Sequence, residues 1–100
     1  MKRWRKKQKK DARDFGARET PRSGGLWGFK GDEVTEDLLI ESKQTEKKSF
    51  SITETLWEKT YEQALKSGKI PVLSIELGNK REIVVLSKED FIELWQKKRK

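Results

Sequence analysis

The feature that most limits the possible folds of this chain is a continuous apolar run at residues 38–40, followed at once by Glu41-Ser42-Lys43. An unbroken apolar run is typical of a strand that is covered on both faces. Because side chains two apart on a strand point to the same side, Glu41 and Lys43 are expected to project together. Burying charged side chains at the end of such a strand costs free energy, so their presence there suggests that they have a function. The end of this strand is therefore the first candidate for a functional site.

A second acidic residue, Asp32, precedes the apolar run. If residues 31–34 pair across a turn with residues 38–43, Asp32 reaches the same side of the sheet as Glu41 and Lys43. Two converging carboxylates suit Mg²⁺ or Mn²⁺, cations that polarise a scissile phosphate, and a lysine beside them can orient a water. The pattern predicts phosphodiester hydrolysis. The alternative is that these groups are ordinary solvated charges of a hairpin.

The motif Gly31-Asp32 followed by Glu41-Ser42-Lys43 resembles that of the PD-(D/E)xK nucleases, the restriction-endonuclease-like superfamily. The flanks, residues 22–24 and 44–51, resemble those of small phage-encoded members related to archaeal Holliday junction resolvases. The resemblance implies a Mg²⁺-dependent endodeoxyribonuclease that acts on branched or duplex DNA in a bacterial or archaeal host cell. Asp32 and Glu41 would be metal ligands, with the Ser42 backbone carbonyl as a third, and Lys43 would position the water. A homodimer is also expected, because a two-fold enzyme matches a two-fold substrate.

Residues 1–18 are predicted to form a helix with Trp4, Ala12 and Phe15 on one stripe, which also carries Gln8 and Asp11. In the resemblance, the helix glutamate that assists the metal site falls on Gln8, which is a departure from the family pattern. Gln8 can still contact a metal-bound water or a phosphate, but it brings no charge. Asp11 is the alternative if the register shifts, and the sequence leaves this choice open.

Polar residues on either side of the strand pair are predicted to contact the nucleic-acid backbone: Arg22, Ser23, Lys30, Gln44, Thr45 and Ser49. The first three belong to a glycine-rich loop, residues 20–31, in which backbone can approach a phosphate closely. The last three follow the motif lysine, and in the resemblance residues at this place approach the backbone. Local turn chemistry is the alternative for them, with equal weight.

The charges of the chain are unevenly distributed. Of its 24 lysines and arginines, seven lie in residues 1–10, and the remainder of the chain has as many bases as its 17 acids. Four more bases form residues 97–100. Basic ends of this kind fit phosphate neutralisation, although a solubilising tail is an equal alternative. We therefore expect one domain, residues 1–100, with basic ends at residues 1–10 and 97–100.

The absence of histidine and cysteine excludes several classes of site within this chain. Zinc fingers, histidine-metal nucleases, thiol nucleophiles and serine-histidine-acid triads all need those residues. The sequence also contains no apolar run of membrane-spanning length, and its basic start lacks the apolar segment of a signal peptide. A cytoplasmic protein without a membrane partner is therefore expected.

The second half of the chain is expected to provide scaffold. Thr53 caps a helix that Gly68 ends, with a core-facing stripe of Trp57, Tyr61, Ala64 and Leu65. Residues 71–77 and 82–86 are expected to form a hairpin.

Ser87 then begins a final helix whose buried stripe is Phe91, Leu94 and Trp95. The order of elements predicts an α/β domain with a central mixed sheet flanked by helices, restriction-endonuclease-like in the resemblance. Two alternatives to a nuclease remain: a non-catalytic nucleic-acid-binding module that has kept this fold, and a small protein whose basic ends bind an acidic partner or ribosomal RNA.

Overall fold

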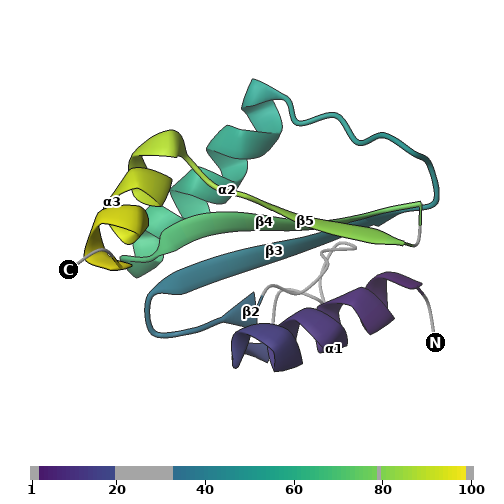
Figure 1. Ribbon diagram of the computed structural model, residues 1–100, viewed down its shortest axis with the longest axis horizontal. Coiled ribbons are helices and arrows are strands. Elements are labelled where there is room, and N and C mark those ends of the chain that lie inside the picture. The colour runs from purple at the N-terminus through teal and green to yellow at the C-terminus, as the bar shows by residue number, and fades with distance from the viewer. Residues whose placement is uncertain (1–2, 20–32, 79, 99–100) are drawn as a thin grey trace.

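The computed structural model describes residues 3–19, 33–78 and 80–98, and within them the chain forms three helices and a five-stranded sheet. The elements are α1 (Arg3–Phe15), β1 (Arg18–Glu19), β2 (Glu33–Val34), β3 (Leu38–Thr45), α2 (Glu54–Ser67), β4 (Ile70–Leu77), β5 (Arg81–Val85) and α3 (Lys88–Lys98). Helix α1 lies on one face of the sheet and α2 on the other (Figure 1). The predicted α/β class is confirmed.

The sheet is mixed, with its strands in the order β1-β2-β3-β4-β5. Strands β3 and β4 run parallel, while the other neighbouring pairs are antiparallel. Glu33 lies opposite Ile40 across the β2–β3 turn, and Ser42 lies opposite Ser74. The predicted pairing across this turn and the predicted hairpin of β4 with β5 are both confirmed within the described residues.

Strand β3 is covered on both faces, as its apolar run predicts. Leu39 packs with Val34 and with Ala64 of α2. Ile40, which points to the opposite face, is fully buried. Residues 39–42 of β3 are all buried, so the polar groups of Glu41 and Ser42 lie in a largely dry environment, whereas residues 43–45 are partly exposed.

Helix α2 begins and ends where its capping residues predict. The Leu56 amide donates to the Thr53 hydroxyl, and Gly68 takes a left-handed conformation with φ 66°. Its buried residues are Thr60 and Ala64, whereas Tyr61 and Leu65 are exposed. The predicted core-facing stripe is therefore wrong for these last two residues, because the helix turns its smaller side chains toward the sheet.

Helix α1 is shorter and differently packed than expected. It ends at Phe15, because Gly16 adopts a left-handed φ of 65° and the Ala17 amide donates to the Ala12 carbonyl. The chain then enters the two-residue strand β1, which the sequence did not reveal. Among the described side chains of α1, Lys7, Gln8 and Asp11 are buried. Gln8 and Asp11 thus lie on the buried side as expected, whereas Ala12 and Phe15 are only half-buried, and the Trp4 side chain lies outside the described part of the structure.

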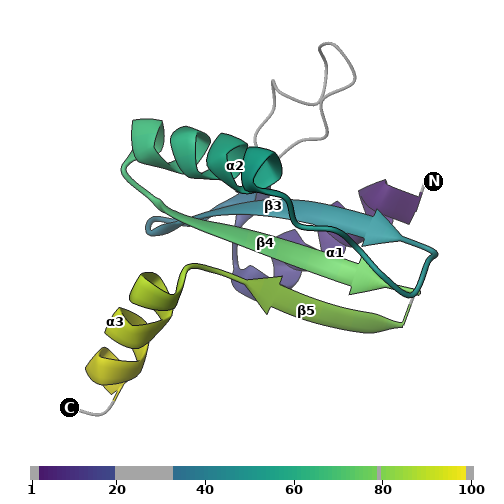
Figure 2. The same cartoon turned by 90° about the horizontal axis from the view of Figure 1, so that it is seen from above.

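Helix α3 contradicts the sequence prediction most clearly. The Asp90 amide donates to the Ser87 hydroxyl, so the predicted start is confirmed. However, the helix has no buried residue, and Phe91, Leu94 and Trp95 are all exposed. The reason is its position: α3 follows β5 at the edge of the sheet and extends beyond that edge instead of lying across a face (Figure 2).

Candidate functional site

Glu41 and Lys43 form an ion pair on the central strand β3. The Lys43 Nζ lies 2.7 Å from the Glu41 Oε2, and the Glu41 side chain is nearly buried. The two residues alternate with Ile40 and Ser42, so they share the sheet face on which Leu39 meets α2. The prediction that Glu41 and Lys43 project together from one side of the strand is confirmed.

The remaining residues of the predicted motif are not all placed by the structure. Asp32 lies outside the described residues, directly before β2 in the sequence. Arg22, Ser23 and Lys30, the predicted loop contacts, also lie outside them. The Ser42 side chain points to the α1 face of the sheet, whereas the side chains of Glu41 and Lys43 point to the other face. Only the backbone of Ser42 can therefore act together with Glu41.

A network of buried charged and hydroxyl groups lies between α1 and the sheet. Its centre is Lys7, whose side chain is fully buried. The Lys7 Nζ lies 3.0 Å from Asp11 Oδ1, 2.9 Å from Ser74 Oγ and 2.9 Å from Glu82 Oε1. A lysine has three protons to donate, and each of these contacts uses one. The ammonium group is thus fully satisfied without water.

Ser42 connects this network to β2. Its Oγ lies 2.6 Å from Asp11 Oδ2 and 2.6 Å from Glu33 Oε1, both carboxylate oxygens of buried residues. A hydroxyl has one proton, so it donates to one of the two oxygens at a time. Ser42 therefore holds the carboxyl groups of α1 and β2 close together on the face opposite Glu41 and Lys43. Gln8 is also buried in α1.

Glu82 closes the network toward the surface. It accepts from Lys10 as well as from Lys7, and these hydrogen bonds, Lys10 first, hold the pKa of its carboxyl below the usual value of 4.5. The same contact raises the pKa of Lys10 above 10.5. Arg3 pairs in the same way with Glu76 of β4. Three bases of α1 thus serve as structural partners of strand carboxylates.

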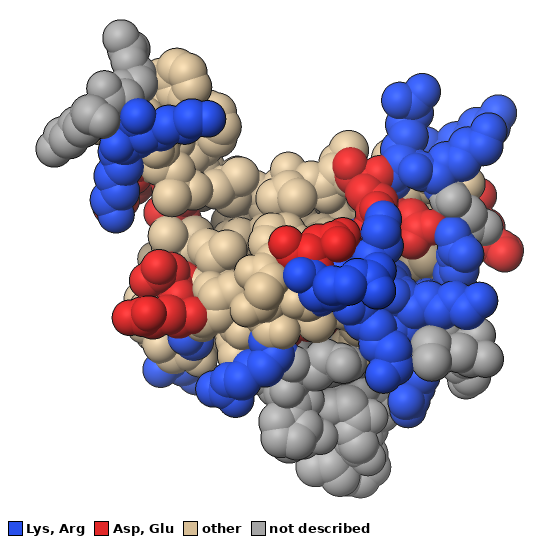
Figure 3. Space-filling model, turned by 60° about the horizontal axis from the view of Figure 1, so that its bottom comes forward, with Lys and Arg blue, Asp and Glu red and all other residues tan. Residues whose placement is uncertain are grey.

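Bases of α1, of β5 and of the turns that follow β3 and β4 form a surface that begins at this network and continues around the end of the sheet. It comprises Arg3, Lys6, Lys10, Lys48, Lys80 and Arg81, and is called here the basic surface. Two pockets, of about 190 and 360 Å³, lie along it and share Lys80. Figure 3 shows Lys and Arg side chains gathered toward one end of the α1 face.

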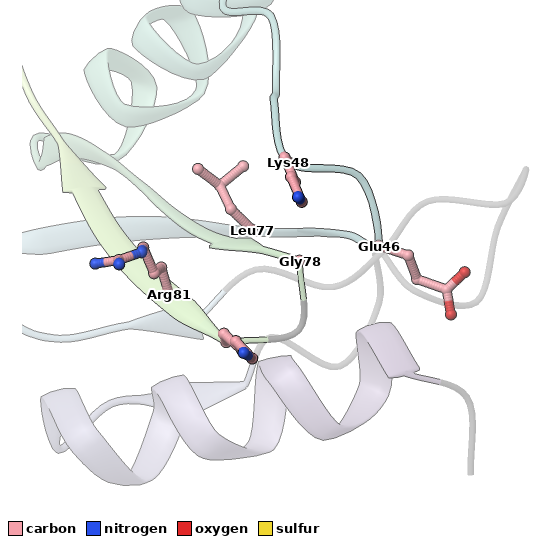
Figure 4. A pocket seen from close by; sticks show the side chains of 6 residues that line it. Glu46, Lys48, Leu77, Gly78 and Arg81 are labelled. Carbon is pink, nitrogen blue, oxygen red and sulfur yellow. The ribbon is translucent and has the colours of Figure 1, made fainter.

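The larger pocket lies where the parallel strands β3 and β4 end. Lys48 and Arg81 flank it, and Glu46 extends away from them (Figure 4). Among the described residues, neither Lys48 nor Arg81 is in an ion pair, and the same holds for Lys6 and Lys80. These four charges are therefore available to an external anion. Lys43 is two residues from the end of β3, about 7 Å along the strand at its usual rise per residue.

The predicted contacts after the motif lysine have mixed environments. Gln44 is half-buried and Ser49 is exposed. Thr45 accepts from the Lys47 amide through its hydroxyl and from the Gly78 amide through its carbonyl. Thr45 therefore has the turn role that the sequence left as its alternative, and it joins the ends of β3 and β4 beside the larger pocket.

Comparisons with known proteins add no relative. No protein-family model, no curated protein and no solved structure matches the chain. Among the described residues, no group of three or more acidic, histidine or cysteine side chains is arranged to hold a metal ion. None of the three described helices has the length and apolar character needed to span a bilayer.

Sequence reasoning missed most of the buried network, although one signal was present. Lys7 lies four residues before Asp11, the spacing of an ion pair on one helix face. Ser42 and Ser74 occupy matching positions on adjacent strands, so their side chains point to the same face. Polar residues at matching strand positions, facing a helix with a polar stripe, could have indicated this network.

Proposed function

We propose that this chain is a metal-dependent DNA endonuclease that hydrolyses phosphodiester bonds in branched or duplex DNA, with a restriction-endonuclease-like fold. The observation that supports it best is the Glu41–Lys43 pair, 2.7 Å apart on a strand that is covered on both faces. A nearly buried carboxylate beside a lysine places a metal-ligand oxygen and a hydrogen-bond donor next to each other on one face of the strand. The resemblance of residues 31–43 to the nuclease motif points to the same chemistry.

The proposed ligands are oxygen donors, which a hard divalent cation prefers. Mg²⁺ binds through one or two carboxylates and takes its other ligands from water and substrate phosphate. Glu41 supplies one carboxylate, and in the proposal Asp32 supplies the other and the Ser42 backbone carbonyl a third oxygen. When bound, Mg²⁺ or Mn²⁺ would polarise the phosphate and make a water more acidic.

The chain's own residues have separate roles in this proposal. Glu41 holds Lys43 by their ion pair and so fixes the direction in which the ammonium donates. Lys43 donates a hydrogen bond to the attacking water or to a phosphate oxygen. The basic surface reaches the end of β3 and attracts the DNA backbone through charge, which makes binding salt-dependent and weakly sequence-specific.

The direct test is a cleavage assay at low salt with a four-way junction, a duplex and a single strand, each with Mg²⁺, with Mn²⁺ and with a chelator. Glu41→Gln and Lys43→Met should lose cleavage while keeping their far-UV circular dichroism. Glu46→Gln and Lys47→Met change the same residue types at exposed positions just after β3 and should cut as the wild type does. Undiminished cutting by Glu41→Gln would refute the proposed site.

A second candidate function is a nucleic-acid-binding module without catalysis. The observation that favours it lies in α1. Position 8 is a glutamine, and the Asp11 carboxylate is hydrogen-bonded to Lys7 and Ser42 on the sheet face opposite Glu41. This candidate predicts binding that is insensitive to metal, with no cleavage in either cation. The same assay, combined with a gel-shift measurement in chelator, separates the two functions.

A further inference from the structure

Helix α3 exposes its large apolar side chains to solvent. Phe91 is 55% exposed, Leu94 42% and Trp95 50%. Their spacing of three and four residues places them on one stripe of the helix. A contiguous apolar stripe on a small protein normally marks a surface that another molecule covers.

A groove separates this helix from the sheet. It has a volume of about 310 Å³, with Leu38, Val72 and Val84 on the sheet side and Phe91 and Leu94 on the helix side. Strand β5 lies at the edge of the sheet, and its Val84, which lines the groove, is 50% exposed. One region thus offers both an apolar helix and an apolar groove. Two copies can associate about a two-fold axis through such a surface, because the apolar helix of each copy can then contact the apolar groove of the other.

The charges of α3 indicate which occupant fits. Its first turn carries the acids Glu89 and Asp90 against the single base Lys88, and its last turn is basic, with Lys97 and Lys98. Two copies of the helix that pack antiparallel place each acidic start opposite a basic end, and their helix dipoles are opposed as well. The pair of Glu93 with Lys97 within one helix is long, at 3.8 Å, and exposed, so these groups can pair across an interface instead.

We propose that a second copy of this chain covers the α3 groove. In this homodimer the two α3 helices pack antiparallel about a two-fold axis, and Phe91 and Leu94 of each copy fill the groove of the other. The inference rests on the apolar and charged groups of α3 and does not depend on nuclease activity. Its test is therefore separate from the cleavage assay.

The first experiment is sedimentation velocity of the full chain over a range of micromolar concentrations. The wild type should be a dimer, and Phe91→Glu and Leu94→Glu should be monomers with unchanged circular dichroism. Ile52→Glu is the matched control, because Ile52 is 43% exposed and lies before α2, outside the groove; it should remain dimeric. A monomeric wild type, assembly larger than a dimer, or a dimer that survives both groove substitutions would each overturn the proposal.

The second experiment tests the antiparallel arrangement by exchanging charge. One variant carries Glu89→Lys and Glu93→Lys, and the other carries Lys97→Glu and Lys98→Glu. Each alone should dimerise at least about tenfold more weakly than the wild type, because like charges then face each other. An equimolar mixture should restore the wild-type affinity as a heterodimer. A mixture no tighter than its separate components would overturn the arrangement.

Discussion

Helices α1 and α3 reverse the usual relation between polarity and burial. Helix α1 is strongly basic, yet it packs against the sheet with a fully buried lysine at its centre. Helix α3 carries an apolar stripe, yet none of its residues is buried. The difference shows that position in the sheet order decides burial here: α1 lies across a face, where strand carboxylates and hydroxyls pair with its charges, whereas α3 follows the edge strand.

The largest effect should come from removing the charge at the centre of the α1 network. Lys7→Met leaves Asp11 buried without its ammonium partner, and breaking a buried pair from one side costs about 3–5 kcal/mol. Urea unfolding measures this free energy. Lys6→Met, one residue away and exposed, should change it by no more than about 0.5 kcal/mol. If both variants have the same free energy of unfolding, the buried ion pair of Lys7 with Asp11 does not stabilise the fold.

A smaller effect is expected at the hydroxyl that joins α1 to β2. Ser42→Ala removes the donor between the Asp11 and Glu33 carboxyl groups, and leaving buried polar groups unsatisfied costs about 1–3 kcal/mol. Ser49→Ala makes the same chemical change at an exposed position and serves as the control in the same urea titration. A Ser42→Ala protein that matches the control would show that this contact is not needed to hold the two elements.

Glu82 should connect stability to pH. Its pKa is lowered in the folded protein, mainly by Lys10, so its contribution to stability is complete above pH 4.5 and is lost as the pH falls through the folded value. Glu82→Gln should cost about 1 kcal/mol at pH 7, as expected of a partly exposed ion pair. Thermal melts from pH 7 down to pH 3 should show the difference from the wild type shrinking at the acidic end. A constant difference over this range would contradict the assignment.

The smallest effect is expected on α3 outside the groove. Ile92 is exposed and does not line the groove, so Ile92→Ser should change the unfolding free energy by no more than about 0.5 kcal/mol. The same change at a buried isoleucine, Ile40→Ser, is the contrasting control and should be strongly destabilising. A large loss of stability in Ile92→Ser would show that this side of α3 is covered after all.

Local signals predicted the elements that depend on local physics. The Thr53 hydroxyl, the left-handed Gly68 and the Ser87 hydroxyl each form the cap that their residue types suggested. The alternation of a strand was enough to place Glu41 beside Lys43. In each case the partner lies within a few residues in the sequence.

Distant pairings could not be predicted in the same way. The partners of Lys7 in β4 and β5 are 67 and 75 residues away, so its burial depends on which strands the fold brings beneath α1. The exposure of Phe91 and Leu94 likewise depends on the place of β5 at the sheet edge. A helical apolar stripe identifies a face that prefers burial, but it does not identify what covers that face.

The long separation between Lys7 and its partners also has a consequence for the order of folding. Lys7 precedes Ser74 by 67 residues in the chain, so during synthesis its ammonium group must remain hydrated until β4 and β5 have emerged and paired. Contacts of such separation form late, because chain closure must be completed first. We therefore expect α1, although it is synthesised before β4 and β5, to dock late, onto a sheet that is already assembled.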